Sequence, residues 1–161
     1  MKYEPLLHVV LYQPEIPPNT GNIGRTCVAV GAKLWLVKPL GFQIDEKQLR
    51  RAGLDYWPHL EWEVVENWDE LTGKLAQPFA SRRIWLLTKT APRPYTQATF
   101  EKGDILVFGS ESAGLPPELL KQFADKSLRI PMRREVRSLN LSAAAAAVIY
   151  EAVRQLRPPI A

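Results

Sequence analysis

The amino-acid sequence predicts an α/β protein with an open parallel sheet and helices on both faces. Short apolar runs alternate with helical patterns along the chain, and this alternation is typical of βαβ units. The first run, residues 6–11, is apolar at almost every position, as expected for a strand that is buried on both faces. A length of 161 residues fits a single domain, 1–161, with a sizeable core.

Each expected element has a local signal. Capping residues, prolines in a first helical turn and glycine after a last turn set the boundaries. Strands are expected at Leu6–Leu11, Leu34–Val37, Glu63–Val65, Ile84–Leu87, Ile105–Phe108 and Leu128–Ile130. Helices are expected from an Asn19 or Thr20 cap to Gly31, and at Leu49–Leu54, Trp68–Leu75, Pro116–Phe123 and Ala143–Leu156.

The last helix is predicted to pack on two sides. Ser138 or Asn140 is expected to cap it. Its apolar stripe follows the helical period and comprises Leu141, Ala145, Val148, Ile149, Ala152, Val153 and Leu156. A second face carries Ala143, Ala146, Ala147 and Tyr150. Alanine is the best helix former, which explains helicity but not this clustering, so burial against another chain is the favoured interpretation.

The composition and the missing motifs exclude several classes of protein. Cys27 is the only cysteine, and it lies far from His8 and His59 in the sequence, so neither a disulfide nor a structural zinc site is expected. No apolar run approaches the length of a membrane span, and no signal-peptide pattern is found, so a cytoplasmic protein is expected. No serine elbow, Cys/His pair or acid cluster appears, which argues against a metal or a covalent nucleophile.

The net charge of +4 and the pI of about 9.3 are modestly basic. The basic residues are clustered, and clusters beside expected strand ends suit a polyanion such as RNA. For any one cluster, a solvated surface is the alternative. The clusters are Lys47, Arg50 and Arg51, then Arg82, Arg83, Lys89 and Arg93, and finally Lys126, Arg129, Arg133, Arg134 and Arg137.

Residues 19–26 lie between the first strand and its helix. Glycines at such a turn often cradle a phosphate, but the spelling here matches neither the dinucleotide fingerprint nor a Walker A loop. Gly24 inside a helix costs about 1 kcal/mol relative to alanine, so close approach of another segment is expected there. Arg25 at the helix start opposes the macrodipole. That position indicates a task such as gripping a phosphate, with an ordinary surface arginine as the alternative.

Two further stretches are candidates for binding. Residues 106–116 end a buried strand in a glycine-containing loop, which is where ligands sit in open α/β sheets. Gly109 is expected to let a flat ligand lie against the backbone, with a plain turn as the alternative. Residues 138–142 offer hydroxyls and amides beside an apolar strand end, and helix capping is their simpler interpretation.

Together these stretches resemble the three motifs of the SPOUT RNA methyltransferases. The first is Asn19-x-Gly-Asn-x-Gly-Arg, the second is Phe108-Gly-Ser-Glu-Ser-Ala-Gly-Leu-Pro, and the third is Ile130-Pro-Met followed by Ser138-Leu-Asn-Leu-Ser. Residues 12–25 and the stretch Arg50-Arg-Ala-Gly-Leu-Asp-Tyr are similar to the subfamily that 2'-O-methylates nucleotide 34, the wobble nucleotide of tRNA. The resemblance runs nearly from end to end.

The resemblance implies S-adenosylmethionine as the methyl donor, without a metal, in a deep trefoil knot formed by the C-terminal third. It implies a homodimer through the last helix and the first-motif helix, with the anticodon stem-loop of tRNA, for leucine isoacceptors, as substrate and with neither DNA nor a membrane as partner. Carried over by position, Leu87, Gly109, Ile130, Ser138 and Leu139 would bind the donor. Arg25, Glu111, Ser138 and Asn140 would form the catalytic or RNA side, with Tyr150 as a further candidate.

Three alternatives stay open. One is a related enzyme that methylates another ribose in tRNA or ribosomal RNA. Another is a non-catalytic RNA-binding dimer, which would bind no methyl donor. A Rossmann-like nucleotide-binding protein is disfavoured by the spelling of residues 19–26.

Overall fold

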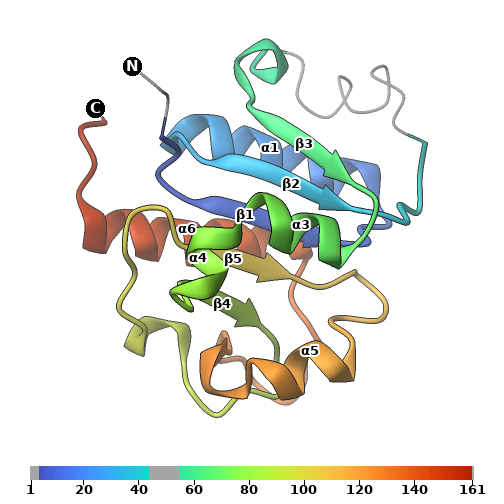
Figure 1. The fold of residues 1–161 in the computed structure, drawn as a ribbon. Coiled ribbons are helices and arrows are strands. Elements are labelled where there is room, and N and C mark those ends of the chain that lie inside the picture. Colours follow the sequence, from blue (N-terminus) through green and yellow to red (C-terminus); the bar gives the residue numbers. More distant parts are fainter. Residues whose placement is uncertain (1–3, 44–54, 161) are drawn as a thin grey trace.

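The computed structural model describes residues 4–43 and 55–160, which form one parallel sheet with helices on both faces (Figure 1). The strand order in this six-stranded sheet is β3-β2-β1-β5-β4-β6. The open parallel sheet predicted from the sequence is therefore confirmed. The strands are β1 (His8–Tyr12), β2 (Lys33–Val37), β3 (Trp62–Val65), β4 (Ile84–Leu87), β5 (Ile105–Phe108) and β6 (Ser127–Leu128).

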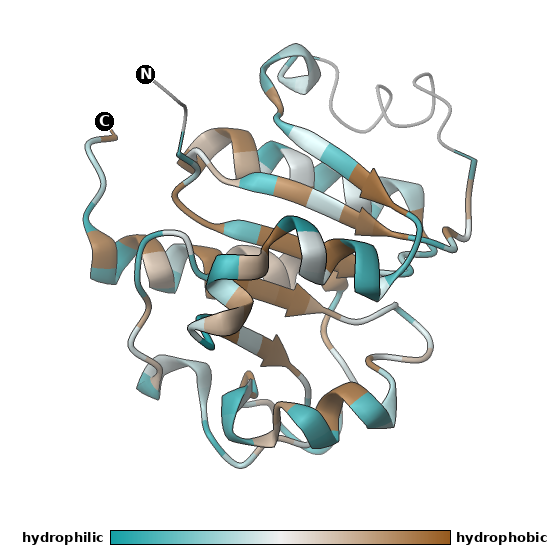
Figure 2. Cartoon of the chain, in the orientation of Figure 1, coloured by the Kyte–Doolittle hydropathy of each residue, from teal (hydrophilic) through white to brown (hydrophobic). Residues whose placement is uncertain are grey.

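Two helical layers cover the sheet. The helices α1 (Pro17–Val30) and α6 (Leu141–Leu156) pack on one face, and α3 (Trp68–Lys74), α4 (Ala76–Ala80) and α5 (Pro117–Gln122) pack on the other. The strands supply both cores by alternation, since Val9 and Leu11 of β1 face the first layer and Val10 faces the second. Burial on both faces explains why the central strand β5 is brown in Figure 2.

The start of α1 differs from the prediction. The helix begins at Pro17, with Ile16 as its N-cap and no side-chain cap, rather than after Asn19 or Thr20. Proline is favoured in a first turn because its missing N–H is not needed there, and the capping preference of the later residues misled the prediction. The C-terminus is as expected, because Gly31 adopts a left-handed conformation with φ of 80°.

The C-terminal helix follows the predicted pattern. Asn140 is its N-cap, and the side-chain oxygen accepts hydrogen bonds from the backbone N–H groups of Ser142 and Ala143. Ser138, the other predicted cap, does not take this place. The helix starts at Leu141, two residues before the predicted start, and it buries Ala145, Val148, Ile149 and Ala152 of the predicted stripe.

Other helix and strand boundaries differ by one or two residues from those predicted from the sequence. The last strand is shorter than predicted, with only Ser127–Leu128 in the sheet, and Arg129 pairs instead with Pro94. Helix α4 was not predicted, because Pro78 inside it reads as a helix breaker. The predicted helix at Leu49–Leu54 and the basic residues Lys47, Arg50 and Arg51 lie outside the described residues.

Candidate active site

The carboxyl ends of three strands lie side by side and bring three of the five predicted donor-binding residues close together: Leu87, Gly109 and Ile130. Leu87 ends β4, and it pairs with Phe108 of β5 on one side and with Leu128 of β6 on the other. Gly109 directly follows Phe108, and Ile130 follows Leu128 by two residues. This edge adjoins the change in strand order between β1 and β5, which is where open α/β sheets bind ligands.

The loop after β5 folds back on itself, which explains why residue 109 is glycine. A Cβ at Gly109 would lie 2.3 Å from the carbonyl carbon of Gly114 and 2.6 Å from the nitrogen of Leu115. The returning backbone is held by paired hydrogen bonds between Ser110 and Gly114, at 3.3 and 3.0 Å. The close approach at Gly109 is thus made by the loop itself, whereas the sequence suggested a flat ligand in that place.

A chain of side-chain hydrogen bonds joins the three predicted motif stretches. The side-chain amide of Asn140 donates to Oδ1 of Asn19 at 3.1 Å. The Nδ2 of Asn19 in turn donates to Oε2 of Glu111 at 3.2 Å. These residues are separated by 121 and 92 positions in the sequence. The three motif stretches, far apart in the sequence, therefore contact one another in the structure.

Glu111 and Glu15 form a reciprocal clasp between the loops after β1 and β5. The carboxylate of Glu111 accepts hydrogen bonds from the backbone N–H groups of Glu15 and Ile16, each at 2.9 Å. The carboxylate of Glu15 accepts from the N–H of Ser112 at 3.0 Å and from its hydroxyl at 2.6 Å. These bonds from Ser112 lower the pKa of the Glu15 carboxyl below its usual value.

The sequence resemblance placed Glu111 on the catalytic or RNA side, and its hydrogen bonds give it a structural role at the start of α1. Its carboxylate binds the two backbone N–H groups that directly precede α1, those of Glu15 and of the N-cap Ile16, and places a negative charge beside the positive end of that helix. Glu15 was not among the predicted site residues. An acid two residues before a double-proline helix start is a signal that could have identified it.

Arg25 lies on the exposed face of α1, and its guanidinium carbon is 5.4 Å from the centre of the Tyr56 ring. It lies six residues after Asn19, which corresponds to about 9 Å along the helix axis. Because α1 begins at Pro17, Arg25 is in the middle of the helix rather than at its start. The predicted conflict with the helix dipole is therefore wrong. Within the described part of the chain, Arg25 has no carboxylate partner.

The remaining predicted residues lie in the exposed loop 131–140 or on α6. Ser138 and Leu139 precede Asn140 and are exposed, with 39% of Leu139 accessible. No hydrogen bond from Ser138 to Leu87 or Gly109 is found among the described residues. Tyr150 is 48% exposed on α6. Beside Asn19, the hydroxyl of Thr20 is buried, and in the described chain it has no hydrogen-bond partner.

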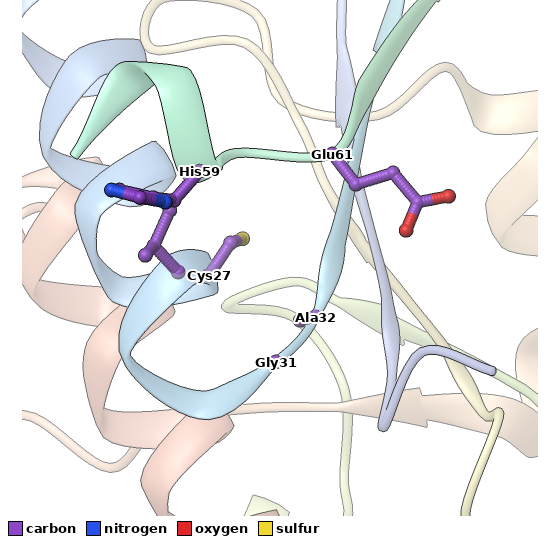
Figure 3. A pocket seen from close by; sticks show the side chains of 6 residues that line it. Cys27, Gly31, Ala32, His59 and Glu61 are labelled. Atoms are coloured by element: carbon purple, nitrogen blue, oxygen red, sulfur yellow. The ribbon is translucent and has the colours of Figure 1, made fainter. Parts of the chain in front are cut away.

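Two surface hollows lie away from the motif residues. The one in Figure 3, of about 280 Å³, is lined by Cys27, Gly31, Ala32, His59 and Glu61 near the amino ends of β2 and β3. Burial raises the pKa of the Cys27 thiol, so it is an inert core residue. The His59 and Glu61 side chains point away from each other. The second hollow, of about 420 Å³, lies among α3, α4 and α5.

Residues 4–43 and 55–160 contain neither a metal-binding cluster nor a membrane-spanning helix. No three His, Cys, Asp or Glu side chains in these ranges are placed to hold a metal ion together. None of the helices in them is both long and apolar enough to cross a membrane.

The fold and the joined loops define a class of protein, an open α/β protein whose site lies at the carboxyl edge of its sheet next to the strand-order switch. The model of the SpoU rRNA Methylase family matches residues 6–150. The chain therefore belongs to the SpoU methylase family.

The chain is also similar to individual proteins within and beyond one subfamily of methyltransferases. A protein of Methylovorus glucosotrophus, named tRNA (cytidine(34)-2'-O)-methyltransferase, is 48% identical over 93% of this chain and 96% of its own length. A solved structure described as giving insights into 2-OH methylation of C/U34 on tRNA has a TM-score of 0.83 at 44% identity, and it covers 92% of this chain and 95% of its own. The AviRb methyltransferase of Streptomyces viridochromogenes, solved with AdoMet, has a TM-score of 0.80 at 28% identity, over 96% of this chain and 59% of its own.

Proposed function

We propose that this protein transfers a methyl group from S-adenosylmethionine to the ribose 2'-hydroxyl of nucleotide 34, cytidine or a modified uridine, in tRNA. The observation that carries the proposal is the hydrogen-bond chain from Asn140 through Asn19 to Glu111, which assembles all three motif loops at one edge of the sheet. The relative and the solved structure that concern nucleotide 34 are 48% and 44% identical to the chain over almost all of its length.

The groups near this edge of the sheet support the binding of an adenosyl group. Ile130 and Leu139 offer apolar side chains, and the backbone N–H groups of Ile130, Ser138 and Leu139 make no hydrogen bonds to other described residues. Such a combination of apolar surface and free polar backbone suits a purine. We assign Leu87, Gly109, Ile130, Ser138 and Leu139 to the donor site. When bound, the donor supplies a sulfonium methyl that is already electrophilic.

The residues of this chain then act mainly by placement. Holding the ribose hydroxyl in line with the methyl group can lower a barrier of this kind by about 7–11 kcal/mol. Arg25 stays protonated, because guanidinium groups are not deprotonated in proteins. We therefore assign it to the substrate phosphate or to the oxygen as negative charge develops on it. Asn140 and Glu111 act on the geometry of the loops, because the side chains of both are engaged in hydrogen bonds.

The surface charge supports an RNA partner. Several cations are within 4.0 Å of a carboxylate and are compensated, among them Lys33, Lys38, Lys74, Arg82, Arg83, Lys102, Arg133 and Arg154. Others lack such a partner in the described chain, and most of these follow β4 or flank β6: Lys89, Arg93, Lys126, Arg129, Arg134 and Arg137. Uncompensated cations around β4 and β6 suit the phosphates of the anticodon stem-loop.

Exposed apolar side chains support a homodimer through α1 and α6. Ile16 at the start of α1 and Tyr150 on α6 are 44% and 48% exposed, and Leu139 before α6 is exposed too. Ala143 and Ala147 lie on the exposed side of α6 and would allow a second backbone to approach. A second subunit there would cover apolar surface that a monomer leaves in water.

The path of the chain after β6 supports a knotted C-terminus. Arg129 binds backbone groups of residues 91–95, and its N–H donates to the carbonyl oxygen of Arg93 at 2.8 Å. The chain then crosses from the β6 edge back to α1, where Asn140 meets Asn19. We propose that this crossing is the trefoil knot, within a single domain 1–161 of a cytoplasmic enzyme.

The proposal is tested with purified protein, labelled S-adenosylmethionine and two transcripts of one leucine tRNA. One transcript carries the normal ribose at nucleotide 34, and the other carries 2'-deoxyribose only there. Methyl transfer to the first and not to the second is the expected result. Equal labelling of both would place the reaction on another ribose, and absence of donor binding in calorimetry would favour an RNA-binding dimer without activity.

A further inference from the structure

Tyr56 is held against the helix that carries Arg25. It ends the stretch 50–56, whose resemblance to the subfamily the proposed site does not use. Its phenol O–H donates a hydrogen bond to the carbonyl oxygen of Gly21 on α1. The face of its ring lies under the guanidinium of Arg25, at 5.4 Å. A cation at this distance is attracted to the ring, by about 0.5–1 kcal/mol at an exposed site.

The glycines of α1 make room for this contact. A Cβ at Gly24 would lie 3.1 Å from Cδ2 of Leu60 and 3.4 Å from Cε2 of Tyr56, so the segment 56–60 packs tightly onto the helix at this point. Gly21 is buried at the carbonyl that Tyr56 reaches. The close approach that the sequence predicted at Gly24 is thus made by the side chains of this segment.

Aromatic neighbours hold the Tyr56 ring in place, and its phenol keeps its proton. The rings of Tyr56 and Trp57 are 6.4 Å apart, and the rings of Trp57 and Trp62 are 5.0 Å apart, so an aromatic row ties Tyr56 to β3. Burial raises the pKa of the Tyr56 phenol, and the positive charge of Arg25 opposes this in part. A phenol that keeps its proton serves as a hydrogen-bond donor and not as a general base.

We propose that Tyr56 is a positioning residue for the methyl transfer: its ring and hydroxyl hold Arg25 in one orientation on α1 before the RNA arrives. This inference rests on the proposed function, because it assumes that Arg25 acts on the substrate. An arginine ordered in advance loses less conformational freedom when it binds. The exposed position of Arg25 otherwise leaves its long side chain free to sample several rotamers.

A double-mutant cycle tests the inference. Single Tyr56→Leu, Tyr56→Phe and Arg25→Ala variants and the double Tyr56→Leu/Arg25→Ala variant are compared with the unaltered protein at saturating donor and tRNA. Tyr56→Leu is expected to lower kcat about 10-fold or more, as misplacement of a reacting group does. Tyr56→Phe keeps the ring and loses about threefold, as expected for one hydrogen bond. In the Arg25→Ala background, Tyr56→Leu is expected to change kcat by less than about twofold.

Two further measurements separate positioning from folding. Phe79→Leu is the matched control, a half-buried aromatic residue on the opposite face of the sheet, and it is expected to lower stability without lowering kcat. Nitrogen relaxation at Nε of Arg25 reports directly on its order, and the side chain is expected to become mobile in Tyr56→Leu. Equal losses of kcat with and without Arg25, or an Arg25 equally ordered in the variant, would overturn the inference. If the unaltered protein transfers no methyl group, the proposed function fails, and the relaxation result still decides whether Tyr56 orders Arg25.

Discussion

The hydrogen bonds that the Glu111 carboxylate accepts before α1 predict a loss of stability in Glu111→Gln. In Glu111→Gln, one oxygen remains to accept from a backbone N–H, while the amide NH₂ faces the other N–H of Glu15 or Ile16. A hydrogen bond to a charged group contributes about 1.5–3 kcal/mol, and a negative charge at a helix N-terminus adds about 0.3–1 kcal/mol. The free energy of unfolding is therefore expected to fall by about 2–3 kcal/mol, which lowers Tm by about 5–10 °C for a chain of this size.

Thermal unfolding at one fixed protein concentration measures the global effect, and hydrogen exchange locates it. The amides of Glu15 and Ile16 are expected to exchange faster in Glu111→Gln than in the unaltered protein. The matched control is Glu118→Gln, an exposed acid in the first turn of α5 that has no salt bridge in the described chain. If both variants melt alike and the two amides stay protected, the clasp does not hold the start of α1.

Three further predictions concern acid stability, loop packing and RNA binding. Burial, followed by the charge of Lys33, lowers the pKa of His8 from 6.5 to about 4. The unfolded chain therefore binds more protons between these pH values, and stability is expected to fall by up to about 3 kcal/mol as the pH drops through them. In His8→Asn, which keeps an acceptor for the indole N–H of Trp35, urea titrations should lose this dependence; an unchanged pH profile would contradict the assignment. Gly109→Ala is expected to destabilise the protein by about 3 kcal/mol, because the added Cβ atom overlaps the backbone of Gly114. In the control Gly73→Ala, the added Cβ atom has no neighbour within 4 Å, so this variant is expected to be neutral or stabilising. Similar unfolding midpoints for these two variants would refute the role of the close approach. For the double variant Arg93→Gln/Lys126→Gln, the slope of log Kd for tRNA against log salt concentration should decrease by about 1 to 2, with the affinity for the donor unchanged. The control Lys102→Gln, whose cation pairs with Glu4, should leave the slope unchanged. Equal slopes in all variants would exclude Arg93 and Lys126 from the tRNA-binding surface.

The sheet was predictable because its residues obey a local rule. A strand buried on both faces must be apolar throughout, and residues 9–11, 34–37 and 105–108 show this directly. The strand order was not predictable, because β1 pairs with β5 across almost a hundred residues and no local signal encodes that partner. Helix α4 was missed because Pro78 reads locally as a helix breaker, whereas it lies in the first turn of this five-residue helix, where its missing N–H is not needed.

The sequence predicted which loops form the candidate site, but not the hydrogen bonds that join these loops. The glycines and capping residues placed the loops at strand ends, and the resemblance supplied Arg25, Glu111 and Asn140. The bonds from Glu111 to the start of α1 and from Tyr56 to Gly21 join residues that are far apart in the sequence. Such pairings follow from the three-dimensional path of the chain, so the hydrogen-bond partners of Glu15 and Tyr56 became visible only in the structure.

The proposed function requires the assembled loops to deliver a methyl group to one ribose of tRNA. The most direct measurement is to incubate the purified protein with S-adenosylmethionine and total tRNA, and to map the modified nucleotide by nuclease digestion and mass spectrometry. A single new 2'-O-methyl group at nucleotide 34 is the predicted result. A methyl group at any other nucleotide, or none in the presence of folded protein that binds the donor, would contradict it.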